Sequence, residues 1–502
     1  MRSFADSDGD GIGDLRGLTG RLDQLNDGDP TTTDDLGVTA LWLMPIAASP
    51  SYHGYDVMDY ESVAADYGTN ADFKALVAAA HARGIRVIVD FEVNHTSIAH
   101  PWFQESRTRG SDHDAWYVWS DTQPSVVAPG GRPVWHPDGG RWYYGYFWEG
   151  MPDLNLRYPP VTAALDDVAI FWLTEMGVDG FRLDAARHLI EDGDALENTA
   201  ATFDWLGRFR DVVHASRTDA LVLGEVWDAT SMASRYIREG SLDLVFEFDL
   251  AAQMLLAVRS GNAGSLVLTE EAITTAYPNG GYGRFLSNHD QDRTFDVVGQ
   301  DAARARQAAT LLLTGPGVPF VYYGEEIGLR GRKPDEQIRT PMPWTGAAPG
   351  FGFTSGKPWE PFAEGAERAN VTAESGDPDS LLAHYRALIH LRSSEPALAG
   401  DARTSPIVAS EASIHAVLRD APGARPVVIV SNLADTPVDQ VTLSMASSPL
   451  CGTVRAIPIF STAPSDDQTA LESPMVEPTG GFSAWSVGRL GPHEDLVIAL
   501  EH

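Results

Sequence analysis

Short apolar runs separated by amphipathic stretches make up most of the chain. Strands of a parallel sheet covered by helices have this pattern, because such strands are buried on both faces. Seven runs fit it, at residues 37–45, 84–95, 177–186, 219–227, 241–249, 283–290 and 317–326. The stretches between them are helical in period, as in residues 70–84, where Asn70 is placed to cap the start and Gly84 the end. The pattern predicts a (β/α)8 barrel with seven of its strands visible.

The eighth barrel strand should lie before the first visible one, where only Met1 to Phe4 stand ahead of an acidic loop. A barrel without its first strand has an unpaired edge, which favours local opening or aggregation. We therefore expect the natural protein to begin upstream of Met1 and to be longer. We expect an extracellular or periplasmic location if a leader was lost upstream, and a cytoplasmic one otherwise.

Two further units are expected besides the barrel. The segment 96–159 is rich in Trp, Tyr, Gly and Pro and poor in helical period, which predicts a domain inserted after barrel strand 3, counting the unseen strand as the first. Residues 399–502 alternate apolar and polar positions between turn residues, as an antiparallel β-sandwich does. The barrel itself would comprise residues 1–95 and 160–398.

The amino-acid composition limits the classes of molecule that the protein is expected to bind. With 70 acidic against 36 basic residues the formal net charge is -34, which would repel nucleic acid and anionic membranes and fits a neutral substrate better. No apolar stretch is long enough for a membrane span. The single cysteine, Cys451, excludes an intrachain disulfide and argues against a thiolate metal cluster.

The first residues, MRSFADSDGDGIGDLRG, alternate acidic side chains with glycines. This spacing suits a hard cation that takes six to eight oxygen ligands, and it predicts a calcium loop. Counting from Asp6, the twelfth position is Gly17 rather than Glu, so the loop is not an EF-hand. A solvated acidic turn is the alternative interpretation. The candidate ligands are the side chains of Asp6, Asp8, Asp10 and Asp14 and the backbone carbonyl of Ile12.

Polar residues lie at or beyond the ends of several apolar runs. The carboxyl ends of parallel barrel strands converge on one mouth, so such residues can meet although they are far apart in the sequence. Any one of them alone would more simply be a solvent-exposed charge. Together they predict a site at the mouth, with Asp56, His95, Asp184, Glu225 and Asp290 as its members.

Two of these carboxyls have contrasting neighbours. The period of two along a strand turns Arg182 and Asp184 to one side, while Phe181 and Leu183 face the helices. A neighbouring arginine favours an ionised Asp184, whereas apolar neighbours favour a protonated Glu225. Two carboxyls held in opposite protonation states, one ionised and one protonated, are what glycoside hydrolysis requires.

Five motifs in this order resemble the signature regions of the α-amylase family of glycoside hydrolases. The resemblance runs from the first residues to the end and includes the inserted and C-terminal domains. The segment MPDLN at 151–155 resembles a form intermediate between the oligo-1,6-glucosidase and neopullulanase types. The motifs are GYDVMDY (54–60), DFEVNH (90–95), GFRLDAARH (180–188), GEVWD (224–228) and FLSNHDQDR (285–293).

The resemblance implies roles for individual residues. Asp184 would be the nucleophile that forms a covalent glycosyl-enzyme, Glu225 the general acid and then base, and Asp290 the carboxylate that holds sugar hydroxyls in the transition state. Such a mechanism retains the anomeric configuration. Arg339 resembles an arginine that pairs with the counterpart of Asp56. The subsite on the non-reducing side would be lined by Tyr55, Asp56, His95, Arg182 and His289.

The resemblance also implies calcium. The acidic loop is similar to the structural calcium loop of family members related to oligo-1,6-glucosidases. A second calcium site, found in true α-amylases near the inserted domain, would use Asn94, Asp153 and the carbonyl of His188.

The substrate expected from the resemblance is an α-1,4-glucan or maltooligosaccharide. Ala185 follows the nucleophile at a position where enzymes that prefer α-1,6 bonds tend to carry valine. The alternatives are an exo-acting α-glucosidase or oligo-1,6-glucosidase, a transglycosylase, and a non-catalytic sugar-binding homologue. We expect a monomer with no nucleic-acid or membrane partner.

Overall fold

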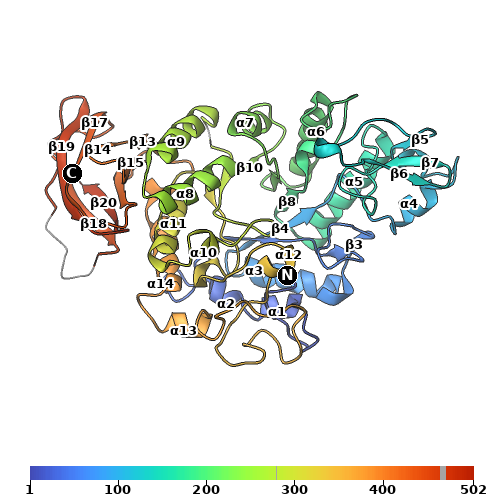
Figure 1. Cartoon of the computed structure of the whole chain (residues 1–502), viewed down its shortest axis with the longest axis horizontal. Helices are drawn as coiled ribbons and strands as arrows, with labels where there is room; N and C mark the ends of the chain where they lie inside the picture. The colour runs from blue at the N-terminus through green and yellow to red at the C-terminus, as the bar shows by residue number, and fades with distance from the viewer. Residues whose placement is uncertain (279, 464–470, 502) are drawn as a thin grey trace.

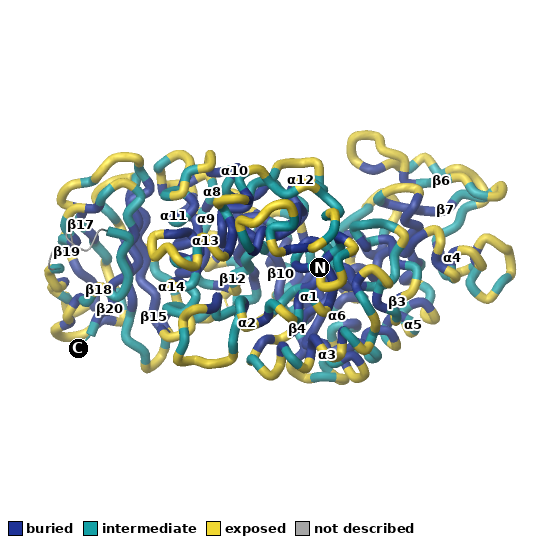
Figure 2. Tube along the Cα trace, turned by 90° about the horizontal axis from the view of Figure 1, so that it is seen from below, coloured by how far each residue is buried: buried dark blue, intermediate teal, exposed yellow. Residues whose placement is uncertain are grey.

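The computed structural model describes residues 1–278, 280–463 and 471–501. Figure 1 shows an elongated molecule with a parallel sheet and its helices in the middle. The C-terminal sheets lie at one end and the segment with β5, β6 and β7 lies at the other. Buried residues concentrate along the strands of the middle part, whereas exposed residues mark the outer loops (Figure 2).

Among the described residues, the middle sheet contains seven strands, all parallel to their neighbours, and each overlaps one of the seven apolar runs. The parallel sheet with alternating helices confirms the expected α/β class. In sheet order the strands are β1 (Ala40–Leu43), β4 (Arg86–Phe91), β8 (Gly180–Leu183), β9 (Leu221–Gly224), β10 (Leu244–Phe246), β11 (Tyr282–Arg284) and β12 (Val318–Pro319).

Helices connect these strands. Their buried side chains join those of the strands in one large apolar cluster. The longer ones are α3 (Asn70–His81), α5 (Pro159–Phe171), α6 (Ala200–Ser216), α7 (Thr230–Arg238), α8 (Phe248–Ser260), α9 (Gly264–Ala276), α11 (Ala302–Thr314) and α14 (Leu381–Ser394). Shorter ones are α1 (Leu15–Thr19), α2 (Leu22–Leu25), α10 (Thr294–Val297), α12 (Asp335–Ile338) and α13 (Val371–Ser375).

The start of α3 differs by one residue from the expectation. Thr69, not Asn70, is the N-cap: its hydroxyl accepts from the backbone N–H of Asp72, whose carboxylate accepts from the backbone N–H of Thr69. This reciprocal pair is a capping box. The Asn70 side chain instead accepts from the backbone N–H of Val63 and ties the helix to the preceding strand.

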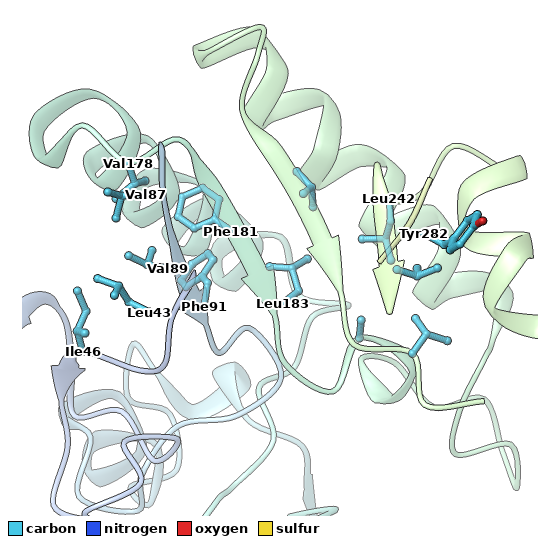
Figure 3. Packing of buried hydrophobic residues seen from close by; sticks show 14 of the residues in the cluster. Leu43, Ile46, Val87, Val89, Phe91, Val178, Phe181, Leu183, Leu242 and Tyr282 are labelled. Atoms are coloured by element: carbon cyan, nitrogen blue, oxygen red, sulfur yellow. The ribbon is translucent and has the colours of Figure 1, made fainter. Parts of the chain in front are cut away.

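The two faces of β8 separate apolar from charged side chains. Phe181 and Leu183 join the cluster shared with the helices, beside Phe91 of β4 (Figure 3). Arg182 points to the other face, where it meets carboxylates from the neighbouring strands. Gly180 allows the start of β8 to approach β9, because a Cβ there would lie 2.3 Å from the carbonyl oxygen of Leu221.

The remaining sheets are antiparallel. In the 96–159 segment, β5 (Trp119–Ser120), β7 (Arg141–Tyr144) and β6 (Trp135–Asp138) form a three-stranded sheet, beside the short helix α4 (Pro101–Ser106). A two-stranded sheet pairs β2 (Ala47–Ala48) with β3 (Asp59–Val63). Two C-terminal sheets share one apolar cluster and confirm the expected antiparallel unit. The five-stranded sheet has the order β13 (Arg403–Pro406), β15 (Ile414–Asp420), β16 (Val427–Asn432), β20 (Asp495–Glu501) and β18 (Arg455–Ser461). The three-stranded sheet has the order β14 (Val408–Ala409), β17 (Val438–Ser447) and β19 (Gly480–Leu490).

Among the residues that the structure describes, none of the helices has both the length and the apolar character to cross a membrane.

Candidate active site

One buried arginine joins two of the predicted catalytic carboxyls. Arg182 of β8 donates from Nη1 to Asp184 Oδ1 at 2.7 Å and from Nη2 to Glu225 Oε2 at 2.6 Å. Asp184 directly follows β8 and Glu225 directly follows β9. The parallel pairing of these two strands therefore places both carboxyls at the same end of the sheet.

Asp290 approaches the same place from the loop after β11. Its Oδ2 lies 3.0 Å from Nε2 of His289, and its Oδ1 accepts from Nη2 of Arg339 at 2.9 Å. The hydroxyl of Tyr55 lies 2.7 Å from the same His289 nitrogen and 3.5 Å from Nη1 of Arg182. A short chain of polar contacts thus connects the third carboxyl to the other two.

Asp90 is a member of this network that the sequence did not single out. Its Oδ1 accepts from Arg182 at 2.8 Å and its Oδ2 accepts from the Tyr55 hydroxyl at 3.2 Å. The side chain is buried in the middle of the sheet. The sequence did contain a sign of this role, because Asp90 is a charged residue inside the apolar run of β4 and a buried charge requires a partner.

Burial and charge set the protonation of the three carboxyls. Burial raises the pKa of Asp184 to about 6, because it outweighs the opposing effect of Arg182. Burial also raises the pKa of Glu225. The pKa of Asp290 is held well below its usual range, since His289 and Arg339 outweigh its burial. The expected protonated Glu225 agrees with this direction. Arg182 lowers the pKa of Asp184, as the sequence suggested, but burial has the larger effect.

The backbone turns sharply after Asp184. Ala185 has a φ of +50°, in the left-handed region that side chains other than glycine rarely occupy. The chain then enters the short helix η5 (Ala186–His188). Residues held in such conformations concentrate at functional sites.

Asp56 and His95 lie beside the network, each buried with its own partners. Asp56 Oδ1 accepts from the hydroxyls of Ser49, at 2.8 Å, and of Ser51. His95 Nε2 lies 3.0 Å from the carbonyl of Tyr55, and burial lowers the pKa of His95 to about 4. His95 is therefore a neutral imidazole that contacts a backbone acceptor.

Arg339 does not form the pairing expected for it. It binds Asp290, Asp335 at 3.1 Å and the carbonyl of His289 at 2.9 Å, whereas Asp56 is satisfied by the two serine hydroxyls. The prediction of an Arg339–Asp56 pair is therefore wrong in this structure. The arginine instead supports the third carboxyl of the site.

The acidic loop gathers three of its predicted ligands. Carboxylate oxygens of Asp6, Asp8 and Asp14 all lie within 4.8 Å of one another. Two ligands of one calcium ion, each 2.3–2.6 Å from the metal, can be no more than about 5 Å apart, so this group fits that cation. Asp10 is not in the group. Its Oδ1 accepts from the backbone N–H of Ile12 at 2.7 Å.

Two of the three residues of the second predicted calcium site are hydrogen-bonded to each other. The side-chain amide of Asn94 donates to the carbonyl of His188 at 2.8 Å. Asp153 Oδ1 accepts from the backbone N–H of Tyr146 at 3.0 Å, and its Oδ2 is buried without a hydrogen bond. The side-chain N–H of Asn94 is bound to the His188 carbonyl that a calcium ion would use. The second calcium site therefore stays a prediction.

Trp227 is an aromatic side chain that the sequence analysis passed over as a possible binding surface. It lies two residues after Glu225 and remains 44 % exposed. Its ring stacks on Phe248 of α8 with centroids 4.6 Å apart and an interplanar angle of 8°. A fixed, exposed aromatic face two residues after a predicted catalytic carboxyl suits the apolar face of a sugar ring.

Comparison with known proteins identifies the class of protein that this fold and site define. The profile described as "Alpha amylase, catalytic domain" matches residues 1–401. The chain is 37% identical to Alpha-amylase 3 of Dictyoglomus thermophilum over 399 residues, covering 78% of this chain and 75% of that protein. It is 34% identical to a probable alpha-glucosidase of Rhizobium meliloti over 466 residues, covering 79% of this chain and 81% of that protein.

A solved structure gives the same result. The alpha-amylase from H. orenii superposes with a TM-score of 0.86 and 39% sequence identity, covering 100% of this chain and 98% of that one. The chain therefore belongs to the α-amylase family of glycoside hydrolases, as the motifs indicated.

Proposed function

We propose that the protein is a retaining glycoside hydrolase that cleaves α-1,4-glucosidic bonds in starch-type glucans and maltooligosaccharides. The observation that carries this proposal is the pair of contacts from Arg182 to Asp184 and to Glu225. They hold two carboxyls, each with a side chain 15% exposed, close together at the carboxyl ends of adjacent strands. Two nearby carboxyls that flank the scissile bond, one as nucleophile and one as general acid, are the requirement of the retaining mechanism.

In the first step an ionised oxygen of Asp184 attacks C1 of the sugar. The bond from C1 to the leaving oxygen breaks, and that oxygen takes the proton of Glu225. In the second step water attacks C1 and gives a proton to the Glu225 carboxylate, and the bond between C1 and Asp184 breaks. Asp290, held anionic by His289 and Arg339, would accept hydrogen bonds from sugar hydroxyls.

The preference for α-1,4 bonds rests on Ala185 and on the named relatives. An α-amylase and a probable α-glucosidase are both among these relatives, so an exo-acting α-glucosidase is the second candidate function. Trp227 supports binding of more than one sugar unit, because it offers an aromatic face outside the buried carboxyl network.

A calcium ion at Asp6, Asp8 and Asp14 would have a structural role. The Asp6 backbone N–H donates to the carbonyl of Phe353 at 2.9 Å, and the Thr354 hydroxyl donates to the Asp6 carboxylate. A cation there would neutralise the mutual repulsion of the carboxylates and fix the loop against this distant segment.

The test is a time course of products from maltoheptaose with calcium present, for the wild type and for Glu225→Gln. Mixed short oligosaccharides that appear early as α-anomers support the proposal, and glucose released one unit at a time supports the exo-acting α-glucosidase instead. Glu239→Gln, the same chemical change at an exposed residue after α7, is the matched control. Undiminished hydrolysis by Glu225→Gln would overturn the assignment.

A further inference from the structure

A row of polar side chains crosses the five-stranded C-terminal sheet on the face that packs against the catalytic part. His415 of β15 lies opposite Ser431 of β16, and Ser431 lies opposite Asp495 of β20. All three residues are at most 3 % exposed. The next row on the same face is apolar and consists of Val417, Ile429 and Val497. A polar row in such a place requires hydrogen-bond partners.

The polar atoms of this row lack those partners. Among the described residues, no group donates to either carboxylate oxygen of Asp495. The hydroxyl of Ser431 and Nδ1 of His415 are also without a hydrogen bond to the described part of the chain. Buried polar atoms that stay unpaired are rare and costly. The protons of the row therefore decide whether its members can satisfy one another.

The side chains of α11 that face Asp495 are used elsewhere. Gln307 and Thr310 lie beside the carboxyl. Gln307 Nε2, however, donates to the carbonyl of Asn432 at 2.7 Å, and the Thr310 hydroxyl donates to the carbonyl of Arg306 at 3.2 Å. These two side chains therefore leave an ionised Asp495 without a donor.

Charged groups face the row from the side of His415. His415 Nε2 lies 2.8 Å from Glu270 Oε2 of α9. Burial would raise the pKa of Glu270, but the neighbouring His415 and two arginines lower it below its usual value. The arginines are Arg284 of β11, whose Nη2 lies 4.0 Å from Glu270 Oε1, and Arg419 of β15. Glu270 is therefore an anion that accepts from the imidazole.

Two further imidazoles lie near α11. His384 Nε2 of α14 lies 3.1 Å from the hydroxyl oxygen of Thr310. His493 Nδ1 lies 3.0 Å from Gln307 Oε1, and its Nε2 lies 2.7 Å from Asp435 Oδ1. The contacts of these imidazoles are thus with α11 and Asp435 rather than with the row.

One proton would complete the row. If Asp495 carries the proton, the acid can donate to Ser431 Oγ and the Ser431 hydroxyl to His415 Nδ1. If His415 carries it, Nδ1–H can donate to Ser431 Oγ and the hydroxyl to the Asp495 carboxylate. Without this proton the Ser431 hydroxyl can serve only one of its two neighbours. The proton therefore belongs to the row as a whole.

We propose that His415, Ser431 and Asp495 form a proton-dependent latch, which fastens the C-terminal sheets to the helices of the catalytic part and loosens when its proton is lost. With the proton bound, hydrogen bonds run across three strands and continue through the contact of His415 with Glu270 into α9. Without it, an ionised carboxyl remains buried at the contact between the two parts.

The pH range of the latch follows from Asp495. Burial raises the pKa of Asp495 to about 7, whereas an aspartate in the unfolded chain has a pKa of about 4. Between these values the folded protein holds a proton that the unfolded chain has released. The stabilisation is therefore complete below about pH 4 and is lost as the pH rises to about 7.

Asp495→Asn tests the latch, because an amide N–H can donate to Ser431 Oγ at every pH. Thermal unfolding of the intact protein is followed by calorimetry between pH 5 and pH 8. The Tm of Asp495→Asn minus that of the wild type should rise by at least about 3 °C over this range. Asp439→Asn, the same change at a side chain of β17 that is 80 % exposed, should follow the wild type. A Tm difference between Asp495→Asn and the wild type that does not change with pH would overturn the proposal.

Ser431→Ala separates the latch from a lone buried carboxyl. The serine links its neighbours only while the proton is bound, so its removal should lower Tm more at pH 5 than at pH 8. Ser447→Ala, at an exposed residue of β17, is the control and should have little effect at either pH. An equal loss of Tm at both pH values in Ser431→Ala would show that Asp495 titrates alone, and the latch would be excluded.

Hydrogen exchange of the wild type locates the effect and decides if a variant does not fold. After correction for the intrinsic exchange rate, protection should fall between pH 6 and pH 8 at residues 427–432 and 495–501 and much less at β4 and β8. A uniform change, or none, contradicts the proposal. None of these measurements requires hydrolysis, so they are independent of the proposed function.

Discussion

Arg182 and Asp184 lie on the same side of β8 and its end, two residues apart, with Nη1 2.7 Å from Oδ1. The guanidinium also reaches Glu225 and Asp90, so its planar fork fixes three carboxyls from three adjacent strands. Its charge opposes the rise in the pKa of Asp184 that burial causes. One side chain therefore both positions the three carboxyls and favours the ionised form of Asp184, the proposed nucleophile.

Arg182→Lys should lower kcat/KM on maltoheptaose by about 10²-fold or more. Lysine keeps the charge but cannot bind carboxyls with two separate nitrogens in a fixed plane, and a displacement of about 1 Å costs that much. Arg208→Lys is the control, because Arg208 binds Asp166 through both terminal nitrogens on the helix surface, at 2.7 and 3.1 Å. Equal loss in both variants would show that a general effect on folding is responsible.

The pH profile of kcat/KM should be bell-shaped, with its acidic limb near pH 6. Asp184 must be ionised to attack, and burial raises its pKa to about 6, so activity should rise as the pH increases through that value. Glu225 must be protonated, so activity should fall again at higher pH. The two carboxyls share one arginine, and the limbs therefore report the pair. An acidic limb near pH 4, the usual value for an exposed carboxyl, would contradict the burial argument.

Removing calcium with EDTA should lower Tm in the wild type and much less in Asp8→Asn. A ligand at 100 times its Kd stabilises by about 2.7 kcal/mol, and this contribution is lost with the ion. Asp8 is the best probe because Asp6 and Asp14 also accept several hydrogen bonds within the loop.

Asp10→Asn is the matched control for the calcium site. Its carboxylate lies outside the group of three, so this variant should respond to EDTA as the wild type does. An equal effect of the two substitutions would favour the wider ligand set that the sequence suggested. No response of the wild type to EDTA would favour the solvated turn.

Trp227→Ala should raise KM for maltoheptaose about 5- to 10-fold with a smaller effect on kcat, since an aromatic stacking contact is worth about 1 kcal/mol. Trp227→Phe keeps an aromatic face on Phe248 and should retain most of the affinity. Steady-state kinetics on maltoheptaose and on maltose compare long with short substrates. If the wild type and both variants have the same KM, the ring does not contact the substrate.

The sequence predicted the seven strands and the meeting of the strand-end carboxyls because both follow from local patterns. A period of two separates Arg182 from Phe181, and parallel strands bring Asp184 and Glu225 to one end of the sheet. It could not predict which charges pair across the mouth. Arg339 and Asp56 have partners set by loop geometry, and no local pattern records that geometry.

The state of Asp184 shows a second limit. A neighbouring arginine is visible in the sequence, but the depth of burial that opposes it depends on the whole packed structure. The calcium loop shows the same limit. The sequence spacing makes all four aspartates equal candidates, and only the backbone conformation of the loop shows that Asp6, Asp8 and Asp14 come together without Asp10.

The C-terminal sheets supply partners for buried groups of the catalytic part. Arg419 of β15 donates to the carbonyl of Thr314 at the end of α11, at 2.6 Å, and Gln307 of α11 donates to the carbonyl of Asn432 in β16 at 2.7 Å. The family profile ends at residue 401, which makes that position an attractive place to shorten the enzyme. Cutting there would leave the carbonyl of Thr314 and the side-chain amide of Gln307 without these partners. The last hundred or so residues therefore cannot simply be removed from the hydrolase without redesign of α11.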